Sequence, residues 1–185
     1  MSWNVGKVRQ ALADKAKEMG LHMPQMQSLL AQERFLARLA SIPEGEKYVW
    51  KGGGLVLRLY QGLDIPRYTV DVDLLAKGIS IEQTQAVFKK AFAIDLGDGF
   101  RFLDIVAVPM ERETPYGGER LEISWTMFGK AQSAALRVDV CTGDVVDDIS
   151  VAAKDFFIYP EGVGALGIHV YPAEFIFAEK LETVF

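Results

Sequence analysis

The most constraining feature of this sequence is a strand-like segment that carries two carboxylates on one face. Residues 68–75 alternate with a period of two, so that Asp71 and Asp73 project to one side and apolar residues project to the other. The two acids then lie about 7 Å apart along the strand and repel each other unless a cation lies between them. Mg²⁺ is the fitting cation, because it prefers oxygen ligands and shares its shell with substrate phosphates, and Mn²⁺ is an alternative.

A glycine triplet precedes this acidic segment. The short apolar run 48–50 predicts a buried strand, and Gly52, Gly53 and Gly54 then open a segment with helical leanings. Glycines at such a turn let backbone N–H groups and the positive end of a helix approach a phosphate closely. The order of strand, glycine turn, helix and acidic strand therefore predicts phosphate binding and metal binding close together.

A third carboxylate, Asp139, lies in the strand predicted over residues 135–141 and points away from its two valine neighbours. Such an acid can join the metal shell or accept the proton of an attacking hydroxyl. Taken singly, each feature also has a structural interpretation. The glycine triplet can be a plain turn, the Asp-x-Asp pair a solvent-facing edge, and Asp139 an exposed strand residue.

The hydrophobic pattern of the whole chain predicts a mixed α/β domain, in which a mixed sheet is flanked by helices. We expect an N-terminal helical segment over residues 1–42 and a core over residues 43–185. Helices are predicted at 5–19, 26–39, 81–93 and 172–185, and the first two are split near Gly20 and Pro24. Strands are predicted at 48–50, 68–75, 100–110, 121–128, 135–141, 156–158 and 167–170.

Composition excludes several classes of protein. The single cysteine, Cys141, excludes a disulfide framework and a cysteine-cluster zinc site, and two histidines argue against a histidine-rich metal site. No apolar run is long enough to span a bilayer and no signal pattern precedes the first helix, so we expect a cytoplasmic protein with no membrane partner. The net charge is −5, yet basic residues are concentrated in the first third of the chain. We expect six of them to offer a surface to RNA: Lys7, Arg9, Lys15, Lys17, Arg34 and Arg38.

Two stretches resemble the motif of nucleotidyltransferases of the DNA polymerase β superfamily. They are Lys51-Gly-Gly-Gly-Leu-Val-Leu-Arg-Leu-Tyr60 and Arg67-Tyr-Thr-Val-Asp-Val-Asp-Leu-Leu75. More narrowly they resemble the AbiEii/AbiGii toxin family, whose pattern is a Gly-Gly turn, a short helix and an Arg-x-Ser/Thr-x-Asp-x-Asp strand. The resemblance continues in family order through residues 116–123, 138–140 and 170–182, and it covers roughly residues 47–185.

The resemblance implies roles for residues of the first motif. Gly52 and Gly53 would hold the nucleotide phosphates, with Gly54 completing the turn. Arg67 and Thr69 match the family residues that precede the acids, and they would orient the strand or contact phosphate. Gly54 departs from the pattern, because many members of the superfamily have Ser or Thr there, and the hydroxyl contact to phosphate is then missing.

The resemblance also implies the roles of the acids and of one lysine. Asp71 and Asp73 would bind Mg²⁺, Asp139 would be the third acid of the catalytic and metal site, and Lys180 would reach the triphosphate from the final helix. Family members continue after that helix into a helical C-terminal region, so we expect the core to be truncated at Phe185.

The activity implied by the resemblance is Mg²⁺-dependent transfer of a nucleotide from a nucleoside triphosphate to an acceptor hydroxyl, with release of pyrophosphate. It further implies a toxin of a toxin–antitoxin or phage-defence pair, with tRNA or another RNA as acceptor and a cognate antitoxin as partner. The alternative is a catalytically idle domain of the same fold that binds nucleotide or a protein partner. The intact Asp71 and Asp73 argue against it, and Gly54 argues for it. No P-loop pattern and no His-Asp cluster supports another phosphate enzyme.

Overall fold

The N-terminal part of the chain forms two helices, as its apolar periodicity predicts. The structure is a computed structural model that describes residues 3–54, 69, 71–108, 118–142, 151–152 and 167–182, the side chains of residues 151, 152, 180 and 182 excepted. Helix α1 (Val5–Met19) begins after Asn4, whose side chain accepts a hydrogen bond from the Lys7 backbone, and ends at Gly20, where φ is +65°. Helix α2 (Met23–Ala40) follows, and the short 3₁₀ helix η1 (Pro43–Lys47) leads into the sheet.

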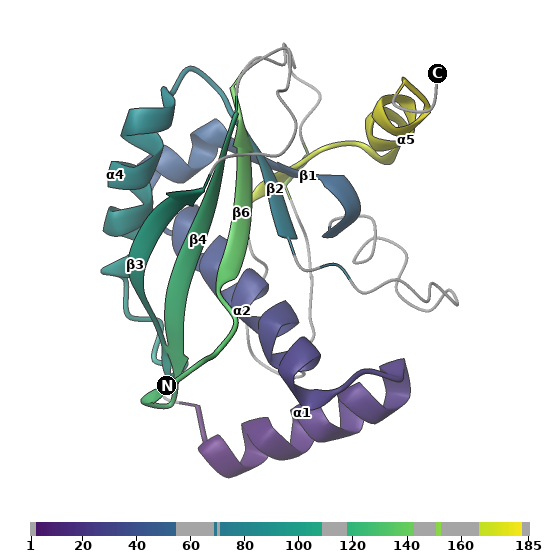
Figure 1. Cartoon of the computed structure of the whole chain (residues 1–185), viewed down its shortest axis with the longest axis vertical. Coiled ribbons are helices and arrows are strands. Elements are labelled where there is room, and N and C mark those ends of the chain that lie inside the picture. Colours follow the sequence, from purple (N-terminus) through teal and green to yellow (C-terminus); the bar gives the residue numbers. More distant parts are fainter. Residues whose placement is uncertain are drawn as a thin grey trace.

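The strands form one mixed sheet with the order β3-β4-β6-β2-β1-β8-β7, and β5 pairs with β4. Strand β2 runs parallel to β6 and antiparallel to β1, so it lies in the middle of the sheet (Figure 1). The bounds of the strands are Tyr48–Lys51 (β1), Asp71–Ala76 (β2), Phe100–Val108 (β3), Gly118–Met127 (β4), Lys130–Ala131 (β5), Leu136–Cys141 (β6), Val151–Ala152 (β7) and His169–Val170 (β8).

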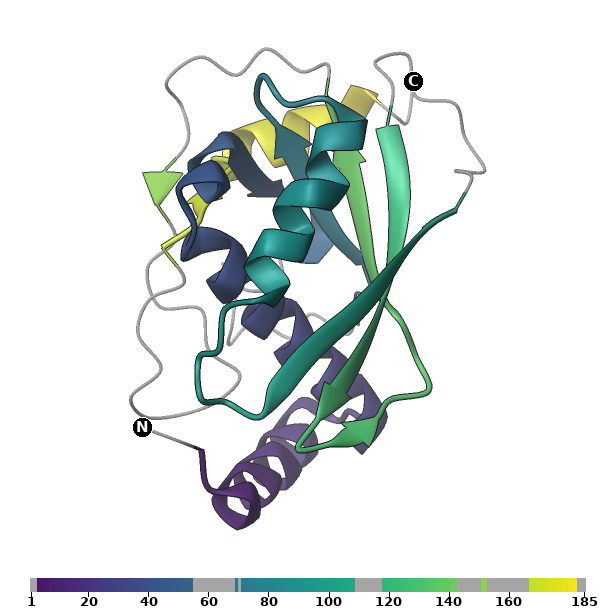
Figure 2. The ribbon, with the colours of Figure 1, turned by 90° about the vertical axis from the view of Figure 1, so that its left-hand side faces the viewer.

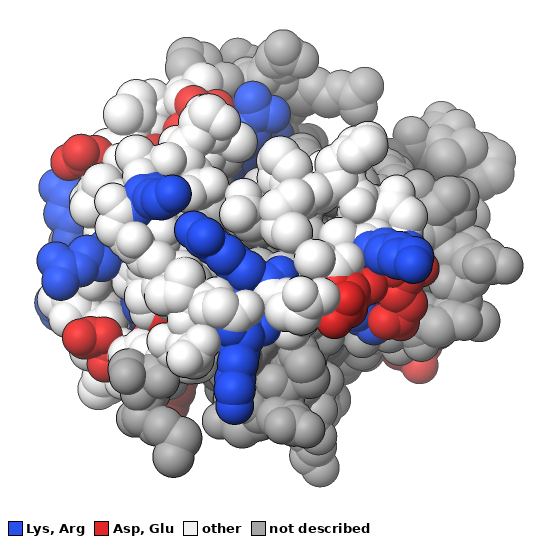
Figure 3. All heavy atoms as spheres, turned by 90° about the horizontal axis from the view of Figure 1, so that it is seen from below, with Lys and Arg blue, Asp and Glu red and all other residues white. Residues whose placement is uncertain are grey.

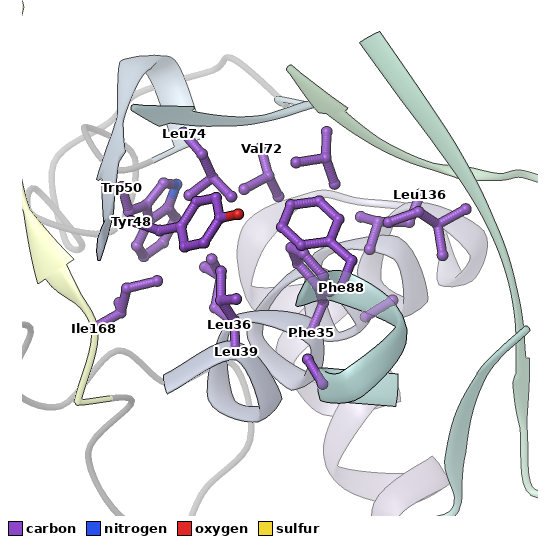
Figure 4. Packing of buried hydrophobic residues seen from close by; sticks show 14 of the residues in the cluster. Phe35, Leu36, Leu39, Tyr48, Trp50, Val72, Leu74, Phe88, Leu136 and Ile168 are labelled. Atoms are coloured by element: carbon purple, nitrogen blue, oxygen red, sulfur yellow. The ribbon is translucent and has the colours of Figure 1, made fainter. Parts of the chain in front are cut away.

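Helices α2 and α4 (Ile81–Phe92) cover one face of the sheet, and α5 (Ala173–Glu182) lies near the β1 end, away from α4 (Figures 1 and 2). Helix α4 starts at Ser80, whose hydroxyl accepts the Gln83 N–H while the Gln83 side chain accepts the Ser80 N–H. The covered face is apolar, because alternate residues of each strand point to the helices. Figure 4 shows this core, to which β1, β2, α2 and α4 contribute Tyr48, Trp50, Val72, Leu74, Phe35, Leu36, Leu39 and Phe88.

A buried ion-pair cluster joins α2 to the turn before β3. Asp98 is fully buried and accepts hydrogen bonds from Arg34 at 2.7 Å and from both terminal nitrogens of Arg38 at 2.8 and 2.7 Å. Arg38 also donates to the backbone oxygen of Phe100, and the guanidinium of Arg34 lies 5.2 Å from the centre of the Trp3 ring. The cluster therefore ties α2, β3 and the start of the chain together.

This cluster corrects one expectation about RNA. Arg34 and Arg38 are 5% and 1% exposed, so neither can meet an RNA backbone. Lys7, Arg9 and Lys17 on α1 are exposed. Figure 3 shows the lower face, where α1 lies, with basic side chains across its middle and a mixed acidic and basic group to one side.

The mixed α/β class with a mixed sheet flanked by helices is confirmed. The predicted helices and the main strands occur within a few residues of their expected bounds. The strand expected at 156–158 lies outside the described residues, and the strand expected at 68–75 is described from Asp71. The division at residue 42 stays a prediction, although residues of α1 and α2 belong to the same core cluster as the sheet.

Candidate functional site

The sheet face opposite α2 and α4 holds charged side chains in cross-strand rows. In the first row the paired residues are Arg120 on β4, Asp139 on β6, Asp73 on β2 and Lys51 on β1. Paired residues of neighbouring strands place their side chains on the same face. The row is therefore one positive charge, two negative charges and one positive charge, so Asp73 and Asp139 are neighbours with a cation on the outer side of each.

The second row lies one pleat away on the same face. It pairs Glu122 on β4 with Arg137 on β6, and Arg137 with Asp71 on β2. Arg137 Nε donates to Glu122 Oε1 at 3.2 Å. The two rows thus place Asp71, Asp73 and Asp139 on one face, where the sequence predicts them to act together, while their roles in metal binding stay predictions.

The guanidinium of Arg120 holds both oxygens of Asp139. Arg120 Nε donates to Oδ1 at 2.7 Å and Nη2 donates to Oδ2 at 2.6 Å, a bidentate pair. Arg120 Nη2 also lies 3.8 Å from Asp71 Oδ2. The hydrogen bonds to Asp139, followed by the negative charges of Asp139, Asp71 and Asp73, raise the pKa of Arg120 further above its usual value. Arg120 is therefore a permanent positive charge among the acids.

The carboxylate of Asp71 is only partly satisfied. Its Oδ1 atom is buried and has no hydrogen-bond partner among the residues that the structure describes, and its side chain is 29% exposed. Burial raises the pKa of Asp71 most, and the negative charge of Asp139 raises it further. The positive charges of Arg120 and Arg137 lower it, but the net shift is upward. A buried carboxylate oxygen without a partner is unfavourable, so it marks a place where a positively charged ligand would be stabilised.

The glycine turn packs directly on the acidic strand. Gly52 has φ +75°, and a Cβ atom added there would overlap the Asp73 carboxylate. A Cβ atom at Gly53 would lie 3.2 Å from Thr69 Oγ1, and one at Gly54 would lie 3.3 Å from the backbone oxygen of Asp71. Gly52, Gly53, Gly54 and Thr69 are thus brought beside the acids, whereas Arg67 lies outside the described residues.

A buried glutamine of α2 supports the start of β2. Gln32 is fully buried, and its Nε2 donates to the backbone oxygen of Thr69 at 3.2 Å. This bond spans from the helix layer to the segment that precedes the acids. Gln32 therefore helps to fix the backbone on which Asp71 is placed.

An ion pair made by Lys51, directly before the glycine turn, connects this turn to helix α5. Lys51 Nζ lies 3.0 Å from Glu179 Oε1 and 5.4 Å from the centre of the Tyr171 ring. The pair is partly buried, with the two side chains 12% and 38% exposed. It places α5, on which Lys180 is located, against the edge of the charged face, but the Lys180 side chain lies outside the described residues.

A cleft of about 440 Å³ adjoins the second charged row. Its walls come from Ser28 and Ala31 on α2, from Glu122 and Trp125 on β4, and from residues 133–137. Arg137, which lines the cleft, is the register partner of Asp71. The volume falls in the range of about 300–1,000 Å³ that is common for small-molecule sites.

The donor set of the charged face fits a hard divalent cation. Three carboxylates lie on one face, and Asp71 has a buried oxygen that lacks a partner among the described residues. In the part of the chain that the structure describes, no three His, Cys, Asp or Glu side chains are grouped closely enough to hold a metal ion as they stand. Arg120 already occupies both oxygens of Asp139. The residues therefore suit Mg²⁺ chemically, while the third acid is engaged by a guanidinium.

Three candidate functional residues were not predicted from the sequence: Arg120, Lys51 and Gln32. Arg120 lies in the stretch 116–123 that resembles the family, and its alternation with Glu122 is the signal that places both on one face. Lys51 lies directly before the glycine triplet, so its position at the end of β1 could have marked it. For Gln32 the only signal is a polar residue on the apolar side of a helix.

The fold is similar to two solved structures from Helicobacter pylori. One is JHP933 from Helicobacter pylori, with a TM-score of 0.51 and 19% identity, covering 84% of this chain and 54% of that chain. Another is an H. pylori protein described, provisionally, as a nucleotidyltransferase, with a TM-score of 0.53 and 20% identity, covering 87% and 59%. This chain thus spans a little over half the length of these proteins, and the likeness shows the fold. Among curated proteins no match is found.

The family model for the nucleotidyl transferase AbiEii toxin of type IV toxin–antitoxin systems matches residues 34–185. The match contains α5, the charged rows and the glycine turn, and it begins inside α2. No described helix is long and apolar enough to cross a membrane. The resemblance drawn from the motifs is therefore confirmed, and the chain belongs to the AbiEii family of nucleotidyl transferase toxins.

Proposed function

We propose that the charged face of the sheet catalyses Mg²⁺-dependent nucleotidyl transfer from a nucleoside triphosphate to a hydroxyl of an RNA, with tRNA as the first class to test. The oxygen of the acceptor hydroxyl attacks the α-phosphorus and forms a new P–O bond. The bond from the α-phosphorus to the oxygen that bridges it to the β-phosphate breaks, and pyrophosphate leaves. The proton of the hydroxyl passes to a carboxylate of the charged face.

The observation that carries this proposal is the buried, unpartnered Oδ1 of Asp71 beside Asp73 and Asp139. These three side chains would hold Mg²⁺, or Mn²⁺ in its place. When bound, the cation neutralises charge on the triphosphate and aligns the attacking and leaving oxygens. A bound cation would relieve the repulsion among these carboxylates, and this relief would contribute to its binding free energy.

The glycine turn supports the nucleotide end of the proposal. Because Gly52 and Gly53 have no side chains, their backbone can approach a phosphate closely next to Asp73. Lys51 is the cation at the same end of the first row, and Lys180 is expected to reach the triphosphate from α5. Phosphate and metal groups would therefore meet at the β1 side of the face.

The cleft beside Arg137 supports a location for a nucleoside. Its volume suits a flat base with its sugar, and its small side chains, Ser28, Ala31 and Ala135, leave room for one. The exposed lysines and arginine of α1 would add attraction for an RNA backbone. As a toxin of its family, the protein would act in the cytoplasm and would be countered by a cognate antitoxin.

The test is label transfer from each nucleoside triphosphate, labelled at the α-phosphate, to total RNA in the presence of Mg²⁺. We expect transfer and equal release of pyrophosphate by the unaltered protein, and loss of at least a hundredfold in Asp71→Asn/Asp73→Asn. The matched control is Asp104→Asn, an exposed aspartate of the same sheet on β3. Transfer that persists in the double variant would contradict the mechanism.

A second candidate function is supported by the bidentate pair of Arg120 and Asp139. If this pair is permanent, the third acid never reaches the substrate, and the domain binds nucleotide without turnover. Binding of a nucleoside triphosphate that requires Asp71 and Asp73, without any transfer to RNA, would favour this idle domain over the enzyme.

A further inference from the structure

The guanidinium of Arg120 lies among the acids that are proposed to bind the metal ion. It is bonded to both oxygens of Asp139 and lies 3.8 Å from Asp71 Oδ2. Asp139 is itself the register partner of Asp73. One guanidinium therefore lies beside two of the three proposed metal ligands, Asp139 and Asp71.

The neighbouring cross-strand pair shows what an ordinary pair on the same two strands looks like. Arg137 makes one hydrogen bond to Glu122 at 3.2 Å, and their side chains are 48% and 35% exposed. The Asp139 side chain is only 12% exposed. It accepts two hydrogen bonds from Arg120, and both are shorter than the bond from Arg137 to Glu122. Burial of Asp139 makes its charge expensive without a partner, so a cation is needed there at all times.

The side chain of Arg120 is 28% exposed and reaches the acids from β4, so its tip can leave them without any change in the strand. A divalent ion that binds Asp139 comes close to a guanidinium that holds both oxygens of the same carboxylate. Each oxygen has a second lone pair, so the competition is one of charge: the two cations repel each other, and moving the Arg120 tip away relieves that repulsion.

We infer that Arg120 is an internal counter-cation that competes with the divalent metal ion for Asp139, and that metal binding displaces its guanidinium. The inference rests on the proposed function, because it takes Asp139 as a metal ligand. In the metal-free protein Arg120 reduces the repulsion between Asp139 and Asp71, and it is a positioning residue for Asp139. It also lowers the affinity for a metal ion that arrives alone.

The first test measures binding of Mn²⁺ alone to the full chain by electron paramagnetic resonance. Removing the competing charge in Arg120→Gln should tighten Mn²⁺ binding at least fivefold, and Arg120→Lys, which keeps the charge but not the fork, should give an intermediate affinity. Arg101→Gln, at an exposed arginine of β3 in the same sheet, is the control and should change the affinity less than twofold. Unaltered or weaker binding in Arg120→Gln overturns the inference.

The second test follows the guanidinium itself by nuclear magnetic resonance, with the Nε–H signal of Arg120 identified by its loss in Arg120→Lys. A bidentate pair protects this proton from exchange with water, so the signal should be present without metal and should shift or vanish as Mg²⁺ is added. A signal that stays unchanged while the protein binds Mg²⁺ overturns the inference even if Arg120→Gln unfolds.

The outcomes separate this inference from the proposed function. If Mn²⁺ binding is lost in Asp71→Asn/Asp73→Asn but has the same affinity in Arg120→Gln as in the unaltered protein, only the competition is refuted. Absence of Mn²⁺ binding by the unaltered protein refutes the metal site and the competition together.

Discussion

Gly52 lies against the Asp73 carboxylate so closely that no side chain fits between the turn and the acidic strand. Its φ of +75° belongs to the left-handed region that glycine adopts without strain. The first glycine of the triplet thus sets both the direction of the turn and the position of an acid, which links phosphate binding to metal binding through one contact.

Gly52→Ala should therefore damage both stability and the site. A backbone held at positive φ costs an alanine about 1–2 kcal/mol, and the clash with Asp73 adds to this. Gly78→Ala is the control, because Gly78 has φ +64° but nothing within 4 Å of an added Cβ. We expect Gly78→Ala to lose about 1 kcal/mol in urea unfolding with Mn²⁺ binding intact, and Gly52→Ala to lose more and to weaken Mn²⁺ binding tenfold. Equal behaviour of the two variants would show that the contact with Asp73 is unimportant.

The raised pKa of Asp71 predicts a pH-dependent stability of the metal-free protein. Folding disfavours the charged form of Asp71, so the free energy of unfolding is reduced at pH values above the raised pKa. This penalty disappears as pH falls to the ordinary aspartate pKa of 3.8 and below. Asp71→Asn should accordingly be more stable than the unaltered protein at pH 7 in EDTA, with a gain that shrinks as pH falls through this window. Denaturant unfolding at several pH values measures it, beside Asp104→Asn. A gain that grows on acidification would contradict the assignment.

The cluster around Asp98 should dominate the stability of the helix layer. Burial alone would raise the pKa of Asp98, but the hydrogen bonds and charge of Arg38 and the bond from Arg34 outweigh it and lower the pKa. Asp98→Asn leaves two buried arginines without their counter-charge, which should reduce the free energy of unfolding by about 3–5 kcal/mol. Asp95→Asn, an exposed neighbour that accepts the Gly97 N–H, should change it by less than about 0.5 kcal/mol.

Stability conferred by Asp98 should also be lost in acid, because a lowered pKa contributes above the unfolded value and is lost as pH falls through the folded value. The Asp98→Asn variant should therefore lose less stability on acidification than the unaltered protein. If both proteins lose the same free energy of unfolding as pH falls, carboxylates other than Asp98 cause the acid sensitivity.

Gln32→Leu tests whether α2 positions the acidic strand. Loss of the hydrogen bond leaves the Thr69 oxygen without this donor and should cost about 1–2 kcal/mol of stability. If the bond positions Asp71, Mn²⁺ affinity falls as well. Gln10→Leu on α1, where the side chain is exposed and bonds to Asp14, should affect neither quantity. A stability loss with unchanged Mn²⁺ affinity would mark Gln32 as purely structural.

Local patterns were sufficient to predict the elements that bear the acids. The alternation in β2 depends only on neighbouring residues, and the Ser80 cap lies beside the helix that it starts, so both are visible in the sequence. The same period of two placed Asp71 and Asp73 on one face of β2 and turned Asp139 away from its valine neighbours in β6, while the pairing of β2 with β6 brings all three to one face.

Contacts between distant segments could not be predicted in this way. The pairing of Arg120 with Asp139 depends on the register between β4 and β6, and the bond from Gln32 to Thr69 joins residues 37 apart. Arg34 and Arg38 were predicted to be exposed, because their buried partner Asp98 is about sixty residues away in the sequence. Such partners are fixed by packing and not by local pattern.

Strand β2 is bonded to a neighbour on both sides, and so is β6. Fraying that starts at the outer strands β3 or β7 must pass through intervening strands before it reaches either of them. The amide protons of Asp73 and Asp139 should then exchange with deuterium only when the whole domain unfolds. The spacing of the acids would thereby be preserved while the periphery of the sheet opens and closes.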